Sequence, residues 1–243
     1  MRILIVENYP QLSAKAASIV ASQVILKNNS VLGLPTGSTP EGMYSELVQL
    51  QKEGKVDFSN VVTFNLDEYL GLSPDHHQSY HYYMHQHFFN HVPVAPHNIH
   101  IPPGQKESTT EHCREYDQKI AAAGGIDLQF LGIGVNGHIG FNEPGPSLKT
   151  GTHIVELTEE TVEANSRFFE SKDHVPRQAI TMGMGSILGA RRIMLLASGT
   201  NKAPAIREAL SGDITTNLPA SFLQLHSDVI LVLDRKAASQ LPT

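Results

Sequence analysis

The alternation of short apolar segments with longer amphipathic ones most constrains how this chain can fold. Residues 2–8, 30–36 and 60–66 are short and rich in aliphatic side chains, as buried strands are. Residues 11–28 carry apolar side chains at the spacing of one helix face. Because strands that are apolar on both sides need helices on both faces of their sheet, the pattern predicts an α/β fold with a mostly parallel sheet.

The same alternation continues to the end of the chain. A helix is expected from Thr39 onward, with Pro40 in its first turn, where the missing amide hydrogen does no harm. The remaining expected helices cover 79–90, 108–125, 159–170, a short stretch ending near Ala190 and 201–212, and the remaining expected strands cover 127–134, 152–157, 179–182, 191–198 and 227–234.

Length and composition narrow the class of protein. The chain has 243 residues without an internal repeat or a low-complexity stretch, so we expect one domain over residues 1–243. Its net charge of -6 gives no bulk attraction to nucleic acid or anionic lipid. The only cysteine, Cys113, cannot form an intramolecular disulfide, which suits a reducing compartment. Without a secretory leader or a run of ~18 apolar residues, the protein is expected to be cytoplasmic and to contact no membrane.

The ends of the expected strands are where a ligand should bind in such a fold. After the second strand, Thr36, Gly37, Ser38 and Thr39 form a small polar turn that opens a helix. Free amides, hydroxyls and the helix dipole would together suit a phosphate group. The alternative is an ordinary capped loop, since serine and threonine cap many helices.

The third strand is followed directly by two carboxylates, Asp67 and Glu68. A carboxylate at this edge of the sheet can act as a general base. The alternative is a solvated pair on a loop.

Glycines follow the strand expected near residue 130. Gly132, Gly134 and Gly137 match the G-x-G-x-x-G pattern of a dinucleotide-binding turn, with Glu156 about twenty residues on. Such a turn must continue into a helix, but the glycines and prolines of 140–146 prevent one, so we do not expect an NAD site.

The same loop carries polar side chains instead. His138 lies two residues from Asn136 and five from Glu143, so that an amide can orient the imidazole and a carboxylate can pair with it. The alternative is a structural histidine that bonds its own loop.

Two positively charged residues join these candidate functional residues. Lys202 lies at the start of a helix, and Arg167 has the side chain best shaped to bind a phosphate through two hydrogen bonds. Each alone could be a surface cation. Together with the hydroxyl-rich turn, the carboxylate and the histidine, they indicate proton-transfer chemistry on a small phosphorylated compound.

Five segments of the chain form a distinctive set: LPTGSTPEGMY, NLDEYLGL, LGIGVNGHIGFNEPG, ANSRFF and SGTNKA. Together they resemble the glucosamine-6-phosphate deaminase family over nearly the whole chain. The resemblance implies a Rossmann-like, three-layer α/β sandwich, no redox cofactor and no metal. It implies conversion of glucosamine 6-phosphate to fructose 6-phosphate and ammonia, and we expect an enzyme of the hydrolase class.

The resemblance also implies roles for individual catalytic residues. His138 would be the acid and base that opens the sugar ring, supported by Asn136 and Glu143. Asp67 would move a proton from C2 to C1 of the opened sugar.

The binding residues follow in the same way. Ser38 and the surrounding turn from Thr36 to Thr39 would hold the phosphate, with Arg167 and Lys202 as cationic partners. Gly137 is also expected to contact the substrate. Arg167 would lie on a lid formed by residues 153–182.

The chain departs from many members of this family in two places. Asn136 replaces an aspartate, which leaves the charge role to Glu143. His153, Val155 and Glu156 stand where the larger members bind an activating sugar phosphate, so we expect no such activation and a monomer or small homo-oligomer.

Two rival functions remain. A 6-phosphogluconolactonase would have a related fold, but its corresponding turn does not continue as FNEP. A sugar-phosphate-sensing regulator would carry a DNA-binding helix-turn-helix, for which this chain has no room. His77, His81 and His85 repeat every four residues and would share a helix face, yet no cysteine or HExxH pattern supports a metal there.

Overall fold

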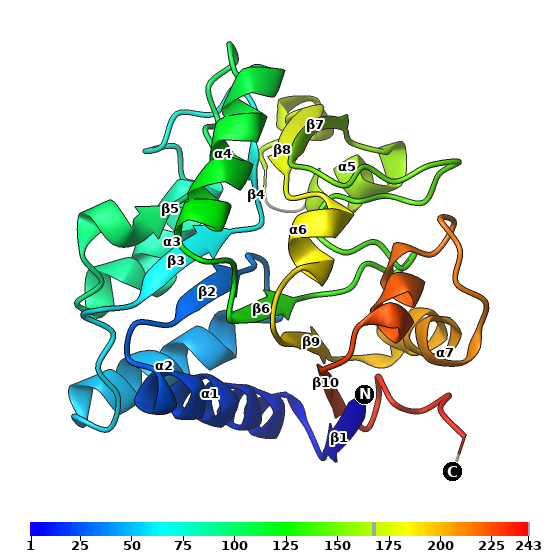
Figure 1. Cartoon of the computed structure of the whole chain (residues 1–243). Coiled ribbons are helices and arrows are strands. Elements are labelled where there is room, and N and C mark those ends of the chain that lie inside the picture. Colours follow the sequence, from blue (N-terminus) through cyan, green and yellow to red (C-terminus); the bar gives the residue numbers. More distant parts are fainter. Residues whose placement is uncertain (167–168, 243) are drawn as a thin grey trace.

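A seven-stranded parallel sheet forms the centre of the computed structural model, which describes residues 1–166 and 169–242 (Figure 1). The strand order is β1-β10-β9-β6-β2-β3-β5, and every neighbouring pair is parallel. The strands are β1 (Arg2–Val6), β2 (Val31–Leu34), β3 (Val62–Asn65), β5 (Ile99–His100), β6 (Leu128–Leu131), β9 (Ile193–Ala197) and β10 (Val229–Asp234).

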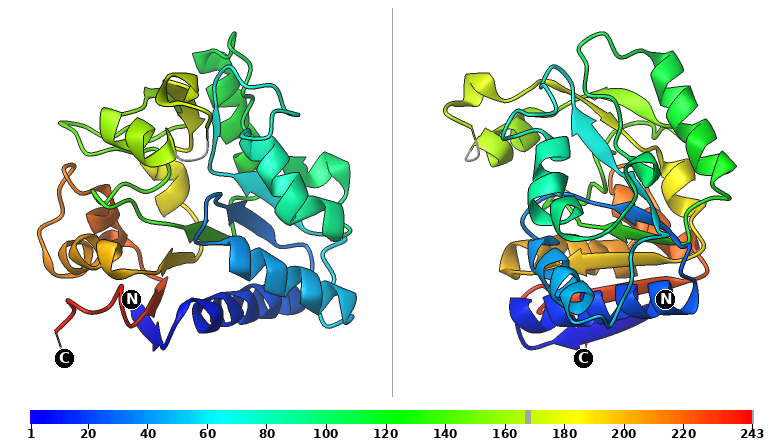
Figure 2. Two further views of the ribbon diagram at one scale, coloured as in Figure 1. Left: turned by 180° about the vertical axis from the view of Figure 1, so that it is seen from behind. Right: turned by 90° about the vertical axis from the view of Figure 1, so that its left-hand side faces the viewer.

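Helices cover both faces of this sheet, which gives the three layers that the sequence predicts (Figures 1 and 2). The side chains of α1, α2 and α3 pack on one face, and those of α4, α6 and α7 pack on the other. The helices are α1 (Tyr9–Leu26), α2 (Glu41–Lys52), α3 (Tyr80–His87), α4 (Thr110–Ala122), α5 (Glu159–Ser166), α6 (Met184–Leu188) and α7 (Ala203–Ser211). Short 3-10 turns lie at 89–91, 96–98, 172–174, 200–202 and 219–225.

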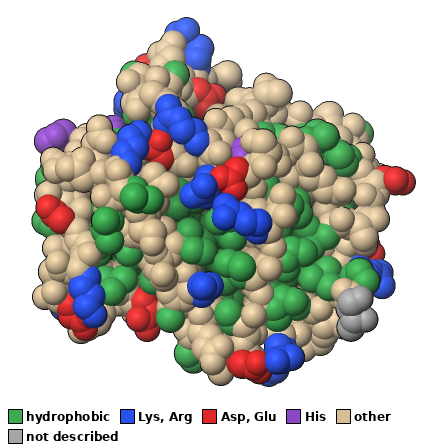
Figure 3. Space-filling view, turned by 60° about the horizontal axis from the view of Figure 1, so that its bottom comes forward, with side chains coloured by type: hydrophobic (Ala, Val, Ile, Leu, Met, Phe, Trp, Pro, Cys, Tyr) green, Lys and Arg blue, Asp and Glu red, His purple; other side chains and the backbone are tan. Residues whose placement is uncertain are grey.

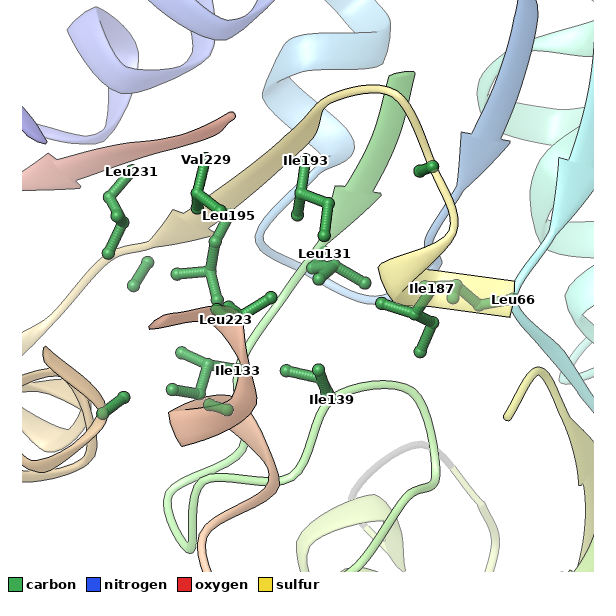
Figure 4. Close-up of a cluster of buried hydrophobic side chains, with 14 of the residues drawn as sticks. Leu66, Leu131, Ile133, Ile139, Ile187, Ile193, Leu195, Leu223, Val229 and Leu231 are labelled. Atoms are coloured by element: carbon green, nitrogen blue, oxygen red, sulfur yellow. The ribbon is translucent and has the colours of Figure 1, made fainter. Parts of the chain in front are cut away.

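Strand β10 shows why the inner strands of this sheet are mostly apolar. Val229 and Leu231 belong to the cluster under α6 and α7, whereas Ile230 and Val232 belong to the cluster under α1. Successive side chains of a strand point to opposite faces, so a strand between two helix layers buries both sets. Figure 4 shows the first cluster, in which Leu195 and Ile193 of β9 lie beside Val229.

A second, three-stranded sheet adjoins the carboxyl ends of β2 and β3 in the central sheet. It consists of β4 (Asp67–Tyr69), β8 (Gln178–Thr181) and β7 (His153–Glu156), and both of its pairs are antiparallel. Leu66 joins the two sheets, because its amide donates to Leu34 O at 3.0 Å and its carbonyl accepts from the Met182 amide at 2.7 Å. Residue 67 is therefore fixed by both sheets.

Most expected elements are confirmed, with boundaries shifted by a few residues. The expected helix over 159–170 is described only as far as Ser166, because residues 167 and 168 lie outside the described parts. The other differences concern strands. β4 and β5 are not expected from the sequence, because three and two residues are too short for a periodic pattern. The expected strands near 153 and 179 form, but they lie in the separate antiparallel sheet.

The edge strand β1 presents apolar side chains to solvent. Ile3 and Ile5 are 44% and 54% exposed, and Ile25 and Leu26 at the end of α1 are more so. Figure 3 shows hydrophobic side chains gathered on the face that comes forward when the lower part of Figure 1 is turned toward the viewer. Edge strands of this kind can pair with another chain. Within the described residues, no helix is both long enough and apolar enough to cross a membrane.

Asp127 ties together the amino-terminal edge of the sheet. Its carboxylate is buried and accepts from the Val31 amide at 2.8 Å, from Lys27 Nζ at 2.7 Å and from Arg191. Burial opposes its ionisation, but the hydrogen bonds from Lys27, Val31 and Arg191 hold its pKa below the usual value.

We expect Asp127→Ala to lower the free energy of unfolding at pH 7 by about 2 kcal/mol, because it leaves a buried amide unpaired. The difference should shrink as the pH falls below about 4, since a depressed pKa contributes stability only above the unfolded-state pKa. Urea unfolding measures both effects. Asp228→Ala is the control, because its partners Arg2 and Arg192 are partly exposed and a surface pair contributes about 1 kcal/mol or less. An equal loss of unfolding free energy in both variants would contradict the structural role assigned to Asp127.

Candidate active site

A cavity of about 240 Å³ lies beyond the carboxyl ends of four neighbouring strands. The segments that follow β3, β2, β6 and β9 all line it, and α5 and the start of α3 contribute further walls. This is the place where open parallel sheets bind ligands. The predicted site residues that line it are Thr36, Gly37, Ser38, Thr39, Asp67, Asn136, His138 and Lys202.

The turn from Thr36 to Thr39 is held from outside by tyrosine hydroxyls. Tyr44 donates to Pro35 O at 2.6 Å, Tyr83 donates to Gly37 O at 2.7 Å and Tyr9 donates to Ser38 O at 3.0 Å. Carbonyl and N–H groups of a trans peptide point in opposite directions, so the amides of residues 36, 38 and 39 point away from these tyrosines.

The backbone of this turn depends on a glycine. Gly37 has φ +102°, a conformation that residues with a side chain rarely adopt. The turn then leads into α2, whose positive end favours an anion. Fixed amides, the Ser38 and Thr39 hydroxyls and a helix end together suit a phosphate monoester.

Asp67 and Glu68 point in different directions, since they are neighbours in β4. Asp67 lines the cavity and is only 6% exposed. Burial, helped by the negative charge of Glu68, raises the pKa of Asp67 to about 8.

Glu68 instead fixes the start of α3. Its carboxylate accepts from the amides of Tyr80 and His81 at 2.8 Å each, and of Tyr69 at 2.9 Å. Burial raises its pKa to about 7 in spite of these hydrogen bonds. Glu68 therefore positions Tyr80, which lines the cavity and is not predicted from the sequence.

Asn136, His138 and Glu143 form a connected group in the loop after β6. Asn136 Nδ2 donates to Glu143 Oε2 at 2.8 Å, and the His138 amide donates to Asn136 Oδ1 at 3.2 Å. His138 Nδ1 lies 3.3 Å from Glu143 Oε2, close enough for an ion pair but without the alignment of a hydrogen bond. Glu143 lies behind the histidine and does not line the cavity itself.

The imidazole also needs a glycine beside it. A Cβ at Gly134 would lie 2.4 Å from the ring of His138. The second glycine of the G-x-G-x-x-G pattern therefore makes room for a histidine rather than for a pyrophosphate. The expected absence of a dinucleotide-binding helix is consistent with the described chain, which runs from β6 to β7 without one.

Glu143 is held ionised by its neighbours. Burial would raise its pKa, but His138, Thr161 and Asn136 outweigh that effect and keep the pKa below the usual value. Asp67 and Glu143 thus have opposite environments within one site. One carboxyl retains a proton near neutrality and the other does not, a pattern typical of acid and base pairs.

Lys202 reaches the cavity from the turn after β9. Its Nζ donates to Ile133 O at 2.7 Å, so it bridges two neighbouring strand ends. Asp234 supports that turn by accepting from Ser198 Oγ at 2.7 Å and from the Gly199 amide at 3.1 Å.

Gly137, which the sequence predicts to contact the substrate, does not line the cavity. This residue turns the chain at φ +82°, and a Cβ there would lie 2.2 Å from Leu218. Arg167 lies outside the described residues. Further residues that the sequence does not predict line the cavity from α3, the loop after β6 and α5, namely Tyr80, Phe141, Glu160, Thr161 and Asn165.

The histidine-rich segment differs from the expectation that three histidines share a helix face. His77 precedes α3 and stacks on His76, and only His81 and His85 lie together on the helix, with ring centroids 4.6 Å apart. Among the described residues, no group of three or more His, Cys, Asp or Glu side chains is arranged to hold a metal ion.

Comparison with known proteins shows the family. Residues 8–232 match the family described as glucosamine-6-phosphate isomerases/6-phosphogluconolactonase, and the chain belongs to this family. A glucosamine-6-phosphate deaminase from Halothermothrix orenii is 61% identical over 241 residues, which cover 99% of this chain and 100% of the relative. The deaminase of Thermoanaerobacter sp. (strain X514) is 58% identical over 242 residues, or 100% and 96% of the two chains.

Solved structures agree with the predicted fold. The structure of a monomeric glucosamine-6-phosphate deaminase, 48% identical, superposes with a TM-score of 0.96 over 98% of this chain and 99% of that one. The 6-phosphogluconolactonase from Leishmania guyanensis is 21% identical, with a TM-score of 0.76 over 100% and 99% of the two chains, and this likeness concerns the fold alone. The predicted family and the α/β sandwich are confirmed.

The expected hydrolase class is wrong. The family description begins with isomerases, and the relatives that are more than half identical to this chain are named deaminases. The lactonase structures from Leishmania guyanensis and Trypanosoma cruzi are only 21% and 18% identical to this chain, so they do not support a hydrolase.

The raised pKa of Asp67 predicts a stability cost that its removal should relieve. The pKa of this carboxyl rises from the ordinary value of 3.8 to about 8 on folding. The folded protein therefore loses stability as the pH increases between these two values. At pH 8 we expect the free energy of unfolding of Asp67→Asn to exceed that of the wild type by about 2 kcal/mol. At pH 5 the excess should be smaller.

Urea unfolding at the two pH values measures this, with the exposed Asp75 replaced by Asn as the control. A variant that is less stable than the wild type at pH 8 would contradict the environment assigned to Asp67.

Proposed function

We propose that this protein catalyses the conversion of glucosamine 6-phosphate and water to fructose 6-phosphate and ammonia. The observation that carries the proposal is one cavity that combines a phosphate-binding turn, a buried carboxyl and a histidine paired with a carboxylate. The names of relatives at 55–61% identity support the same reaction.

In the first step, His138 opens the sugar ring. It takes the proton of the anomeric hydroxyl and returns one to the ring oxygen, which needs a base that is readily reprotonated. Ionised Glu143 favours the positively charged imidazole that exists between the two transfers. Asn136 fixes the carboxylate of Glu143 in that position.

In the second step, Asp67 moves a proton from C2 to C1 of the open chain. In the free enzyme its pKa of about 8 keeps it largely protonated at neutral pH, whereas abstraction needs the carboxylate. The positively charged amino group of the substrate, attached to C2, favours the ionised form of Asp67. The resulting enolamine becomes an imine at C2, where water replaces the nitrogen and ammonia leaves.

The phosphate would bind in the turn from Thr36 to Thr39, with Lys202 nearby. Anchoring this end fixes C1 and C2 beside Asp67, which converts the proton transfer into an effectively unimolecular step. We assign substrate binding to Thr36, Gly37, Ser38, Thr39 and Lys202.

We further propose that residues 1–243 act as one catalytic domain and that 153–182 serves as its lid, as far as that segment is described. It forms two strands of the antiparallel sheet and α5, from which Glu160, Thr161 and Asn165 reach the cavity. A monomer or small homo-oligomer fits the relative described as monomeric, and the exposed edge strand β1 is where a second chain would pair. The reducing, cytoplasmic location remains part of the proposal.

The reaction is tested by measuring ammonia and fructose 6-phosphate released from glucosamine 6-phosphate with EDTA present and no nucleotide. We expect the wild type to release equal amounts of both products. In Asp67→Asn, kcat should fall by at least about a thousandfold, because the general base is removed. In the wild type, kcat/KM should rise with pH up to about 8, as Asp67 of the free enzyme ionises. Hydrolysis of 6-phosphogluconolactone without ammonia release would instead show a lactonase.

Binding of the phosphate is tested separately through Ser38. We expect Ser38→Ala to raise KM by about tenfold while kcat changes little, because a hydrogen bond to a charged group is lost from both ground and transition states. Inorganic phosphate should inhibit the wild type competitively and the variant more weakly. An unchanged KM together with unchanged inhibition would place the phosphate elsewhere. Ser45→Ala on the exposed side of α2 is the control.

A further inference from the structure

Both carboxylate oxygens of Glu143 have partners, although the steps above use only the partners of Oε2. Oε2 faces Asn136 at 2.8 Å and His138 at 3.3 Å, while Oε1 accepts a hydrogen bond from the Thr161 hydroxyl. The Glu143 side chain is 7% exposed, so little water can replace a lost donor. Thr161 is 5% exposed, and its hydroxyl is committed to this contact.

A second threonine directs the proton of Thr161. Thr158 immediately precedes α5, and its hydroxyl oxygen accepts from the Thr161 amide at 3.2 Å, as a helix cap does. The same Thr158 hydroxyl donates to Thr161 Oγ1 at 3.2 Å. A threonine hydroxyl has one proton, so the proton of Thr161 is left for Glu143.

The contact joins two parts of the fold that meet at the cavity. His138 and Glu143 belong to the loop after β6 of the central sheet, whereas Thr161 belongs to α5, between β7 and β8 of the antiparallel sheet. We propose that Thr161 is a positioning residue of the reaction, whose hydroxyl holds the Glu143 carboxylate against His138. The inference rests on the proposed function, because it assigns Thr161 to the ring-opening step.

Loss of this hydroxyl has a defined chemical effect. Without it, one oxygen of a buried carboxylate has no donor, so the ionised form of Glu143 is less favoured and its pKa rises. A protonated Glu143 no longer favours a positively charged imidazole, and ring opening slows. The phosphate turn lies on other elements and is not affected, so KM should hardly change.

The experiment compares Thr161→Val with Thr161→Ser, using glucosamine 6-phosphate and the wild type beside them. We expect Thr161→Val to lower kcat by about tenfold, with KM within about twofold. The acidic limb of its kcat profile should move to higher pH, because Glu143 is protonated more readily. Thr161→Ser keeps a hydroxyl and should restore both the rate and the profile.

Thr152→Val is the matched control. Thr152 is 7% exposed and donates to Asp117 Oδ1 at 2.6 Å, so it also loses a buried threonine-to-carboxylate hydrogen bond, but it does not line the cavity. This variant should lose stability in thermal unfolding while its pH profile stays that of the wild type. Thr161→Ala is a second hydroxyl-free variant for use if Thr161→Val does not fold.

The outcomes separate this inference from the proposed function. A wild type that releases no ammonia overturns the proposed function. An active wild type whose Thr161→Val or Thr161→Ala variant keeps the same kcat and profile overturns the role of Thr161 alone. That role is also overturned if Thr161→Ser is impaired as much as Thr161→Val, since the hydroxyl would then not be responsible.

Discussion

The parallel register of β9, β6, β2 and β3 is the constraint on which the site depends. Because all four strands run the same way, their carboxyl ends meet at one edge, and the chain leaves each of them at the cavity. The turn from Thr36 to Thr39, the carboxyl of Asp67, the His138 loop and Lys202 come from four separate segments for this reason. Leu66 joins the second sheet to the same ends of these strands through its two backbone hydrogen bonds, and α5 of that part of the chain contacts Glu143 through Thr161.

The two carboxyl groups of the proposed reaction differ because their surroundings do. Asp67 is buried beside another acid, so folding favours its neutral form, and the substrate must bring the positive charge that ionises it. Glu143 is also buried, but three side chains support its charge. In the proposed reaction, Asp67 would therefore lower the stability of the free protein and serve as a base whose charge state depends on the bound substrate. Sites that work in this way are commonly less stable than they could be.

How much of the fold and site is predictable depends on whether the signal is local. The inner strands of the central sheet are predictable because burial on both faces leaves a nearly continuous apolar run, as in β10. β4 and β5 are not, because three and two residues carry no period. Asp67 and His138 stand out because they closely follow strands in the sequence.

Other features depend on contacts between segments that are distant in the sequence. The hydroxyls of Tyr9, Tyr44, Tyr83 and Thr161 reach their partners only in the folded chain, so no local pattern reveals their roles. Gly137 is expected at the substrate from its motif alone, whereas its packing against Leu218 is set by the tertiary structure.

The most direct test is a crystal structure of the wild-type protein with fructose 6-phosphate bound. We expect the phosphate against the amides of Ser38 and Thr39, with C1 and C2 of the open chain within hydrogen-bond distance of the Asp67 carboxyl. His138 should lie within hydrogen-bond distance of O1 or O5, the two oxygens between which it moves a proton in the ring-opening step. A sugar bound with its phosphate elsewhere, or with Asp67 out of reach of C1 and C2, would contradict the proposed division of roles.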